Sequence, residues 1–190
     1  MRANEAMTAT SEKNKGDPGT IGKVLKNDLV VTLVLMGLVV VAVFVFREIL
    51  IITLNTDYPL HTPISTSMQP TLNVGDYLIV QGVDDDSEIN ADKEIGDIVV
   101  FRKPTDPDEF IVHRVVEKTW NEEEGIYYFK TKGDNNRSSV PWSITKDDII
   151  GKVVWKIPLL GYIKIFLGTQ IGMVMVVILF LILIVLEGWK

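Results

Sequence analysis

Two long apolar stretches stand toward the two ends of the chain, and the residues between them have mixed polarity. Residues 29–46 (LVVTLVLMGLVVVAVFVF) carry no charged side chain, and residues 165–186 contain the uncharged run IGMVMVVILFLILIVL. A helix of about 20 apolar residues crosses the hydrocarbon core of a bilayer. The second stretch also lacks the polar face that a helix of a soluble domain would show. The pattern predicts two transmembrane helices and excludes a transporter with many spans.

The first apolar stretch could alternatively be the core of a cleaved signal peptide. A polar leader of 28 residues precedes it and no A-x-A cleavage site follows, so we interpret it as an uncleaved anchor. Lys23 and Lys26 precede this span, against the single Arg47 beyond it, which predicts a cytoplasmic N-terminus. We expect a flexible cytoplasmic leader (1–28), a span (29–46), a domain outside the cytoplasm (47–164), a second span (165–186) and a cytoplasmic tail (187–190), in the cell membrane or a secretory-compartment membrane.

The middle of the chain consists of short β-branched and aromatic runs between turn residues, which is typical of strands. No helical crossover pattern separates these runs, so an antiparallel sheet or barrel-like domain is predicted, not an α/β fold. The fold class is therefore mainly β, with an antiparallel domain flanked by two transmembrane helices. The predicted strands are 77–80, 98–101, 110–116, 126–130 and 149–157.

The charge of the chain lies mostly in this middle region. The formal charge is −6 overall, and residues 48–170 hold 12 Lys/Arg against 20 Asp/Glu. An acidic domain without a basic stripe is a poor nucleic-acid binder, and the excess is typical of a soluble face. The chain has no cysteine and two histidines, which excludes disulfides, thiol catalysis and Cys-ligated zinc and argues against a multi-His metal site.

Three short segments carry residues that suit nucleophilic catalysis. A serine in 65–71 (STSMQPT) could act as a nucleophile if a base reaches it. His113 lies in the run FIVHRVV and has the side chain best suited to proton transfer near neutral pH. An aspartate in KGDNN (132–136) could orient a histidine. Taken singly, the more common explanations of the three segments are a Ser/Thr-rich loop, a packed strand histidine and a turn.

Taken in order, the segments resemble the motifs of type I signal peptidases. The similarity runs from about residue 63 to residue 162 and is closest to the branch of archaea, the endoplasmic reticulum and sporulating Gram-positive bacteria, in which a histidine replaces the bacterial lysine. The matching motifs are SMQPT (67–71), VGDYLIV (74–80), GDIVVF (96–101), IVHRV (111–115) and TKGDNN (131–136).

The resemblance implies a membrane-bound serine endopeptidase that cleaves signal peptides from exported preproteins after small residues at positions −1 and −3. It implies Ser67 as the nucleophile and His113 as the general base. It also implies an oxyanion hole formed by the Ser67 backbone N–H and the Ser65 hydroxyl, and it requires no metal or organic cofactor. The implied partners are preprotein signal peptides, the lipid bilayer and the protein-export machinery.

The acidic member of the triad departs from the family pattern. Many members of the histidine branch carry an aspartate five or six residues after the G-D aspartate, where this chain has Ser139 and Val140. We therefore predict Asp134 as the acid, with Asp147 and Asp148 as alternatives and Ser139 as a supporting hydrogen-bonding residue. His61 matches no motif and is expected to be a loop residue.

Two other functions fit the same organisation. One is a non-catalytic, membrane-anchored β-domain that binds or scaffolds partners, in which Ser67 and His113 would be replaceable. The other is a dedicated processing peptidase for surface proteins.

Overall fold

The computed structural model describes residues 28–188, which form two compact units. One unit comprises residues 44–178, and the other contains the remaining helical segments at the two ends of the described chain. The predicted leader lies outside the described residues apart from Asp28, and so do the last two residues of the predicted tail.

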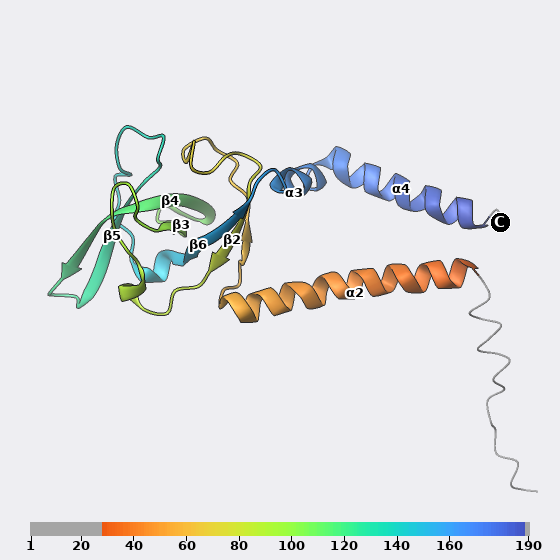
Figure 1. Ribbon diagram of the computed structural model, residues 1–190, viewed down its shortest axis with the longest axis horizontal. Coiled ribbons are helices and arrows are strands. Elements are labelled where there is room, and N and C mark those ends of the chain that lie inside the picture. Colours follow the sequence, from red (N-terminus) through yellow and green to blue (C-terminus); the bar gives the residue numbers. More distant parts are fainter. Residues whose placement is uncertain (1–27, 189–190) are drawn as a thin grey trace, which may run out of the picture. The chain divides into compact units, whose positions relative to one another are not determined.

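The larger unit is built on one antiparallel sheet of six strands in the order β1-β2-β6-β3-β4-β5 (Figure 1). This confirms the mainly β fold class. The strands are β1 (Leu60–His61), β2 (Tyr77–Gln81), β3 (Ile98–Lys103), β4 (Asp106–Asn121), β5 (Ile126–Lys132) and β6 (Ile149–Ile157).

Both faces of the central strand β3 are buried. Val99 and Phe101 point into one apolar cluster and Val100 points into the other, as the alternation of side chains along a strand requires. The second cluster also takes in Met68 and Leu72, which are 1% and 3% exposed. The serine-rich segment is therefore fixed to the sheet by its own apolar residues.

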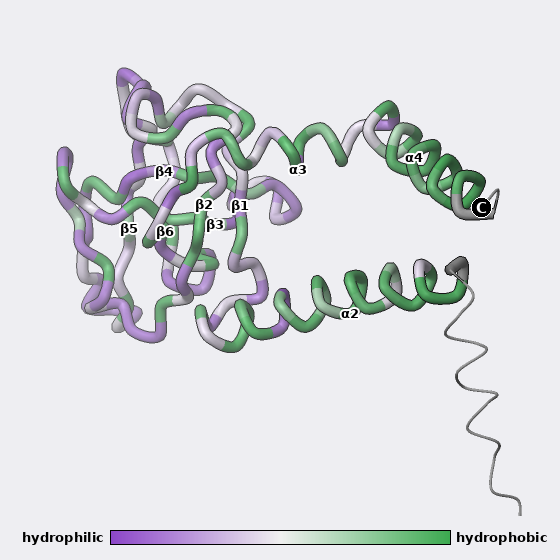
Figure 2. The backbone as a smooth tube through the Cα atoms, turned by 45° about the vertical axis from the view of Figure 1, so that its right-hand side comes forward, coloured by the Kyte–Doolittle hydropathy of each residue, from purple (hydrophilic) through white to green (hydrophobic). Residues whose placement is uncertain are grey.

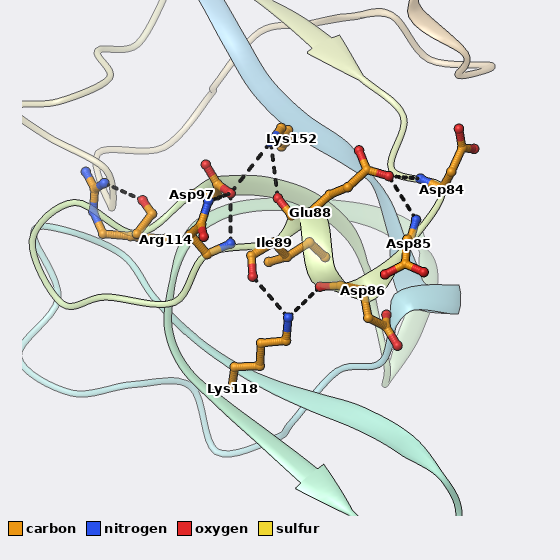
Figure 3. Close-up of polar contacts among 11 residues, drawn as sticks. Asp84, Asp85, Asp86, Glu88, Ile89, Asp97, Arg114, Lys118 and Lys152 are labelled. Carbon is orange, nitrogen blue, oxygen red and sulfur yellow. Dashed lines mark hydrogen bonds and ion pairs between the residues drawn. The ribbon is translucent and has the colours of Figure 1, made fainter.

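The acidic run at residues 84–86 lies between β2 and β3 and ends in the short 3-10 helix Asp86–Glu88. Lys118 donates to the backbone carbonyls of Asp86 and Ile89 at 2.6 and 3.3 Å, and the Glu88 carboxylate accepts from the backbone of Asp84 and Asp85 (Figure 3). These contacts give the acidic run a structural role in closing the loop.

Helix α2 (Asp28–Leu54) has 27 residues and is long and apolar enough to cross a membrane from Val30 to Leu54 (Figure 2). At 1.5 Å per residue it is about 40 Å long. It extends beyond the predicted boundary at residue 46, because Arg47 pairs with Glu48 at 2.6 Å and the apolar run ILIITL continues the helix.

Two helices occupy the C-terminal region in place of a single one. Helix α3 (Gly161–Leu167) and helix α4 (Gln170–Gly188) are bent by 85° relative to each other. The Thr169 hydroxyl accepts the Gly172 N–H at 3.0 Å and begins the new helix. Gly172 lies so close to the Phe166 carbonyl that a Cβ atom would clash with it. The predicted span 165–186 thus includes the end of α3, the corner and most of α4.

Candidate active site

Ser67 lies in the loop between β1 and β2, one residue before the buried Met68. Two backbone hydrogen bonds, from Gln69 to Thr66 and from Leu72 to Met68, shape this loop into tight turns. The Ser67 and Ser65 hydroxyl oxygens are 3.1 Å apart. The two serines implied by the resemblance are therefore neighbours in space as well as in sequence.

His113 lies on β4 opposite Val99 of β3 and is only 6% exposed. Within residues 28–188 its Nδ1 atom has no hydrogen-bond partner. Burial lowers the pKa of His113, and the negative charge of Asp134 partly opposes this lowering. The imidazole is therefore held neutral near pH 7, which is the form that accepts a proton.

The loop after β5 closes over both residues. The Asn135 N–H donates to the Ser67 carbonyl at 2.8 Å, and the Asn135 side chain donates to the Thr66 carbonyl at 3.1 Å. A Cβ atom on Gly133 would lie 2.6 Å from the Ser67 carbonyl oxygen and 3.0 Å from His113 Nε2. Only glycine fits there without displacing a neighbour. The three segments singled out in the sequence thus meet at one place.

Within the described part of the chain, the Ser67 hydroxyl makes its side-chain contact with Ser65 and shares no hydrogen bond with His113. Catalytic hydrogen bonds are often long in a free enzyme and shorten when substrate binds. The geometry therefore brings Ser67 and His113 into one site without a hydrogen bond between their side chains.

Asp134 does not hydrogen-bond to His113 in the described residues. Its carboxylate accepts two hydrogen bonds from Arg114, at 2.9 and 2.7 Å, and one from the Thr71 hydroxyl at 2.5 Å. Burial tends to raise the pKa of Asp134, but the hydrogen bonds from Arg114 and Thr71 outweigh it and the pKa is lowered. The carboxylate is thus ionised and influences His113 through its charge.

The other acid and hydroxyl candidates lie elsewhere. Asp148 accepts hydrogen bonds from the backbone and hydroxyl of Thr145, and Asp147 lines a different cavity, which contains neither Ser67 nor His113. Ser139 is exposed, and no hydrogen bond joins it to His113 within residues 28–188.

Ser67 and His113 open onto a cleft of about 670 Å³. One wall is the segment before Ser67 and the other is the first half of β4. Both walls present apolar side chains, including Ile64, Met68 and Phe110, with Lys164 of α3 at the margin. An extended peptide of small and apolar residues would fit between walls of this kind.

Arg114 is a site residue that the sequence analysis missed. It is 9% exposed, and besides its fork onto Asp134 it donates to the Gly96 carbonyl at 2.7 Å (Figure 3). The fork connects β4 to the loop that touches Ser67. Alternation along β4 was the available signal, since it places Arg114 on the face opposite His113.

His61 is the other missed residue. It belongs to the two-residue strand β1 and lines the cleft, with its ring against Tyr58 and Phe110. Burial, aided by the nearby positive charge of Lys164, lowers the pKa of His61 from 6.5 to about 4. It is therefore neutral at physiological pH and forms part of the cleft wall.

Comparison with known proteins shows the family to which the chain belongs. The family model for signal peptidase, peptidase S26, matches residues 29–117. The chain is 34% identical over 136 residues to the signal peptidase complex catalytic subunit SEC11 of Lachancea thermotolerans, which covers 67% of this chain and 76% of that protein. It is 29% identical over 158 residues to the signal peptidase complex catalytic subunit SEC11C of Homo sapiens, covering 79% and 78% of the two chains. The chain therefore belongs to the peptidase S26 family of signal peptidases.

Proposed function

We propose that the protein is a membrane-bound serine endopeptidase that removes N-terminal signal peptides from exported preproteins. The observation that supports this most directly is that Ser67 and His113 line one apolar cleft and that the loop at residues 133–136 contacts both of them. Family membership supplies the reaction class, and the site supplies residues of the types that this reaction needs.

In the proposed reaction, neutral His113 accepts the proton of the Ser67 hydroxyl as the serine oxygen attacks the scissile carbonyl. The C–N bond then breaks, His113 returns the proton to the departing amine, and water hydrolyses the acyl-enzyme. For this step the Ser67 side chain leaves its contact with Ser65 and turns toward the imidazole. The Ser67 backbone N–H and the Ser65 hydroxyl stabilise the oxyanion. One such donor contributes about 3–4 kcal/mol to the transition state.

Asp134 is proposed as the acidic residue, acting through charge. Its carboxylate raises the pKa of His113 toward the working range and stabilises the imidazolium that forms during attack. Arg114 limits this effect by neutralising part of the carboxylate's charge at 2.7 Å.

Substrate binding is proposed to use the free edge of β4. Residues 114–121 of β4 pair with β5, whereas Asp106 and residues 110–113 pair with β3 and, within the described residues, with no strand on the other side. An unpaired edge offers backbone N–H and C=O groups to an extended chain. A signal peptide lying there would project alternate side chains into the cleft, which fits the small residues at −1 and −3 that family members favour.

The bilayer is proposed to be crossed twice, by α2 and by α4, with both termini in the cytoplasm and the β-domain outside. This rests on α2, which is long and apolar enough to span, on the apolar pair α3 and α4, which reach that length together, and on Lys23 and Lys26 beside the first span. Preprotein signal peptides would then share the bilayer with the enzyme. The names of the relatives place them in a complex, so we include further subunits and the export machinery among the proposed partners.

Preprotein cleavage by the purified full chain in detergent tests the proposal. Ser67→Ala and His113→Ala should each lower kcat by at least about 10³-fold, while the matched variant Ser139→Ala should stay close to wild type. Full cleavage by Ser67→Ala would reject this site. Failure of the wild type to cleave any preprotein, in detergent or in vesicles, would favour the non-catalytic alternative.

A further inference from the structure

We propose that α3 lies in the interfacial layer of the bilayer and sets the height of the cleft above the membrane. The side chains that would insert are Leu159, Leu160, Ile163, Phe166 and Leu167, called here the interfacial face. The inference deepens the proposed function and rests on α4 being a membrane span.

The interfacial face is apolar and exposed within its own unit. Leu159 is 67% exposed, Ile163 58% and Phe166 44%. Contiguous exposed apolar side chains of this size mark a site of contact with a partner or a membrane. Leu159 also has a φ of 66°, a backbone conformation that disfavours a side chain. The chain thus places a leucine, and points it outward, where glycine or asparagine would fit more easily.

The other side of α3 is attached to the β-domain. The Gly161 N–H donates to the Gly75 carbonyl at 2.8 Å, and a Cβ atom on Gly161 would lie 2.5 Å from the Asp76 carbonyl oxygen. Lys164, one turn later, reaches the Leu60 carbonyl at 3.4 Å and lines the cleft. Residues three apart share a helix face, so α3 has one side toward the domain and an apolar side away from it.

The features of the chain indicate that the lipid bilayer covers this apolar side of α3. Helix α4 has 19 residues, about 28 Å at 1.5 Å per residue, which is close to a hydrocarbon core of about 30 Å, and it counts as an apolar span together with α3. The 85° bend at residues 168–169 turns α3 nearly perpendicular to α4. A short apolar helix at a right angle to a span lies in the plane of the interface.

A fixed depth for α3 has a direct effect on the cleft. Thr62 and Lys164 both line the cleft and both belong to the contact between α3 and the domain. Holding α3 in the interfacial layer therefore holds the cleft, with Ser67 at its end, close to the membrane surface. A cleavage site that follows directly on the apolar core of a signal peptide would be within reach.

Spin labels at single cysteines test the depth of α3, because the wild-type chain has no cysteine. The variants are Leu159→Cys, Ile163→Cys and Phe166→Cys in the full chain, reconstituted in vesicles of phosphatidylcholine and phosphatidylglycerol. The matched control is Trp120→Cys, on the β4–β5 hairpin, where the native side chain is 49% exposed. The ratio of collision with oxygen to collision with an aqueous nickel chelate should be several-fold higher at the three α3 labels. Ratios equal to the Trp120→Cys control would overturn the proposal.

A second experiment distinguishes an effect on membrane contact from an effect on the catalytic reaction. The double variant Ile163→Asp/Phe166→Asp should lower kcat/KM on a preprotein embedded in the same vesicles about tenfold or more. Cleavage of a short soluble peptide in detergent should change no more than about twofold, as should both activities of Trp120→Asp. An equal loss on both substrates would reject the interfacial role. If the α3 labels were buried in the membrane but the wild-type chain cleaved no substrate, the interfacial role of α3 would stand and the proposed function would be rejected.

Discussion

The charge beside His113 is set by a pair of residues with opposite effects. Asp134 raises the pKa of the imidazole, while Arg114 holds the Asp134 carboxylate through two hydrogen bonds. The two residues are therefore expected to shift the acid limb of the pH–rate profile in opposite directions.

Replacing Asp134→Asn removes the charge that raises the pKa of His113. The pKa of the base falls, so the acid limb of kcat/KM should move to lower pH. Since no hydrogen bond joins Asp134 to His113 in the described residues, the loss of kcat should be about tenfold, well below the ~10⁴ seen for a hydrogen-bonded triad aspartate. A pH profile of peptide cleavage measures both, and a limb that moves to higher pH would contradict the assignment.

Replacing Arg114→Gln leaves the Asp134 charge uncompensated. The pKa of His113 rises, and the acid limb should move to higher pH. The partly buried Asp134 carboxylate, left without the arginine, should also cost about 1–2 kcal/mol of unfolding free energy, measured by urea denaturation in detergent. Arg114→Lys keeps the charge but loses the planar fork. The acid limb should therefore return close to its wild-type position, whereas the free energy of unfolding should recover less. A limb unchanged in both variants would limit Arg114 to a structural role.

His61 is expected to make the folded state sensitive to acid. Its pKa is about 4 in the folded chain against 6.5 for an unperturbed histidine. The unfolded chain binds a proton as pH falls below 6.5 and the native chain does not until about pH 4, so stability is lost across that window. Allowing for the partial exposure of the ring, the loss is about 1–2 kcal/mol. His61→Phe should reduce the difference in unfolding free energy between pH 7 and pH 4.5 by this amount; an unchanged difference would exclude His61 as its source.

The order of the motifs predicted which segments of the chain meet in space. The sequence did not predict which individual side chains pair with each other. The motif order brought Ser67, His113 and the loop containing Asp134 into one prediction, and the structure gathers them. The partner of Asp134 could not be read from the sequence, because an arginine beside a histidine on a strand says nothing about which distant loop crosses the opposite face.

At the scale of elements, the loop after β5 is the part that unites the site. It contacts the Ser67 backbone and lies against His113, and Gly133 makes this close approach. Gly133→Ala should displace one of the two and lower kcat about 10²-fold. Gly37→Ala is the matched control, since nothing lies within 4 Å of the added Cβ there. If the activity of Gly133→Ala equalled that of the control, displacement of the loop would have no effect on kcat.

The strands show how far sequence patterns can predict the boundaries of elements. The prediction for β6 agrees with the structure at both ends, because its apolar run is bounded by turns. Strand β4 is longer than predicted at both ends, since cross-strand pairs with β3 and β5 hold polar residues in place that a propensity argument assigns to loops. Strand β1 has two residues, too few for any pattern. The corner between α3 and α4 was missed for a similar reason, because hydropathy alone carries no information on backbone direction.

At the scale of the whole molecule, the corner at residues 168–169 connects the β-domain to its C-terminal helix. Gly172→Ala would force the Phe166 carbonyl away and open the bend. Spin labels at Ile163→Cys and Met175→Cys should therefore move apart in this variant, measured by pulsed dipolar spectroscopy on the full chain in vesicles. Gly168→Ala is the control, because its Cβ would make ordinary contacts at 3.4 Å. An unchanged distance in Gly172→Ala would show that other contacts fix the corner.

The free edge of β4 at residues 106–113 carries a consequence of a different kind. Backbone amides are common to all polypeptides, so a strand edge recognises an extended conformation and depends little on the amino-acid sequence of its ligand. One gene product can then serve a whole collection of exported proteins whose leaders share no sequence, provided that each arrives extended and narrow. Under the proposed binding mode, released leader fragments would compete for the same edge, and turnover would depend on how quickly the membrane or another protease removes them.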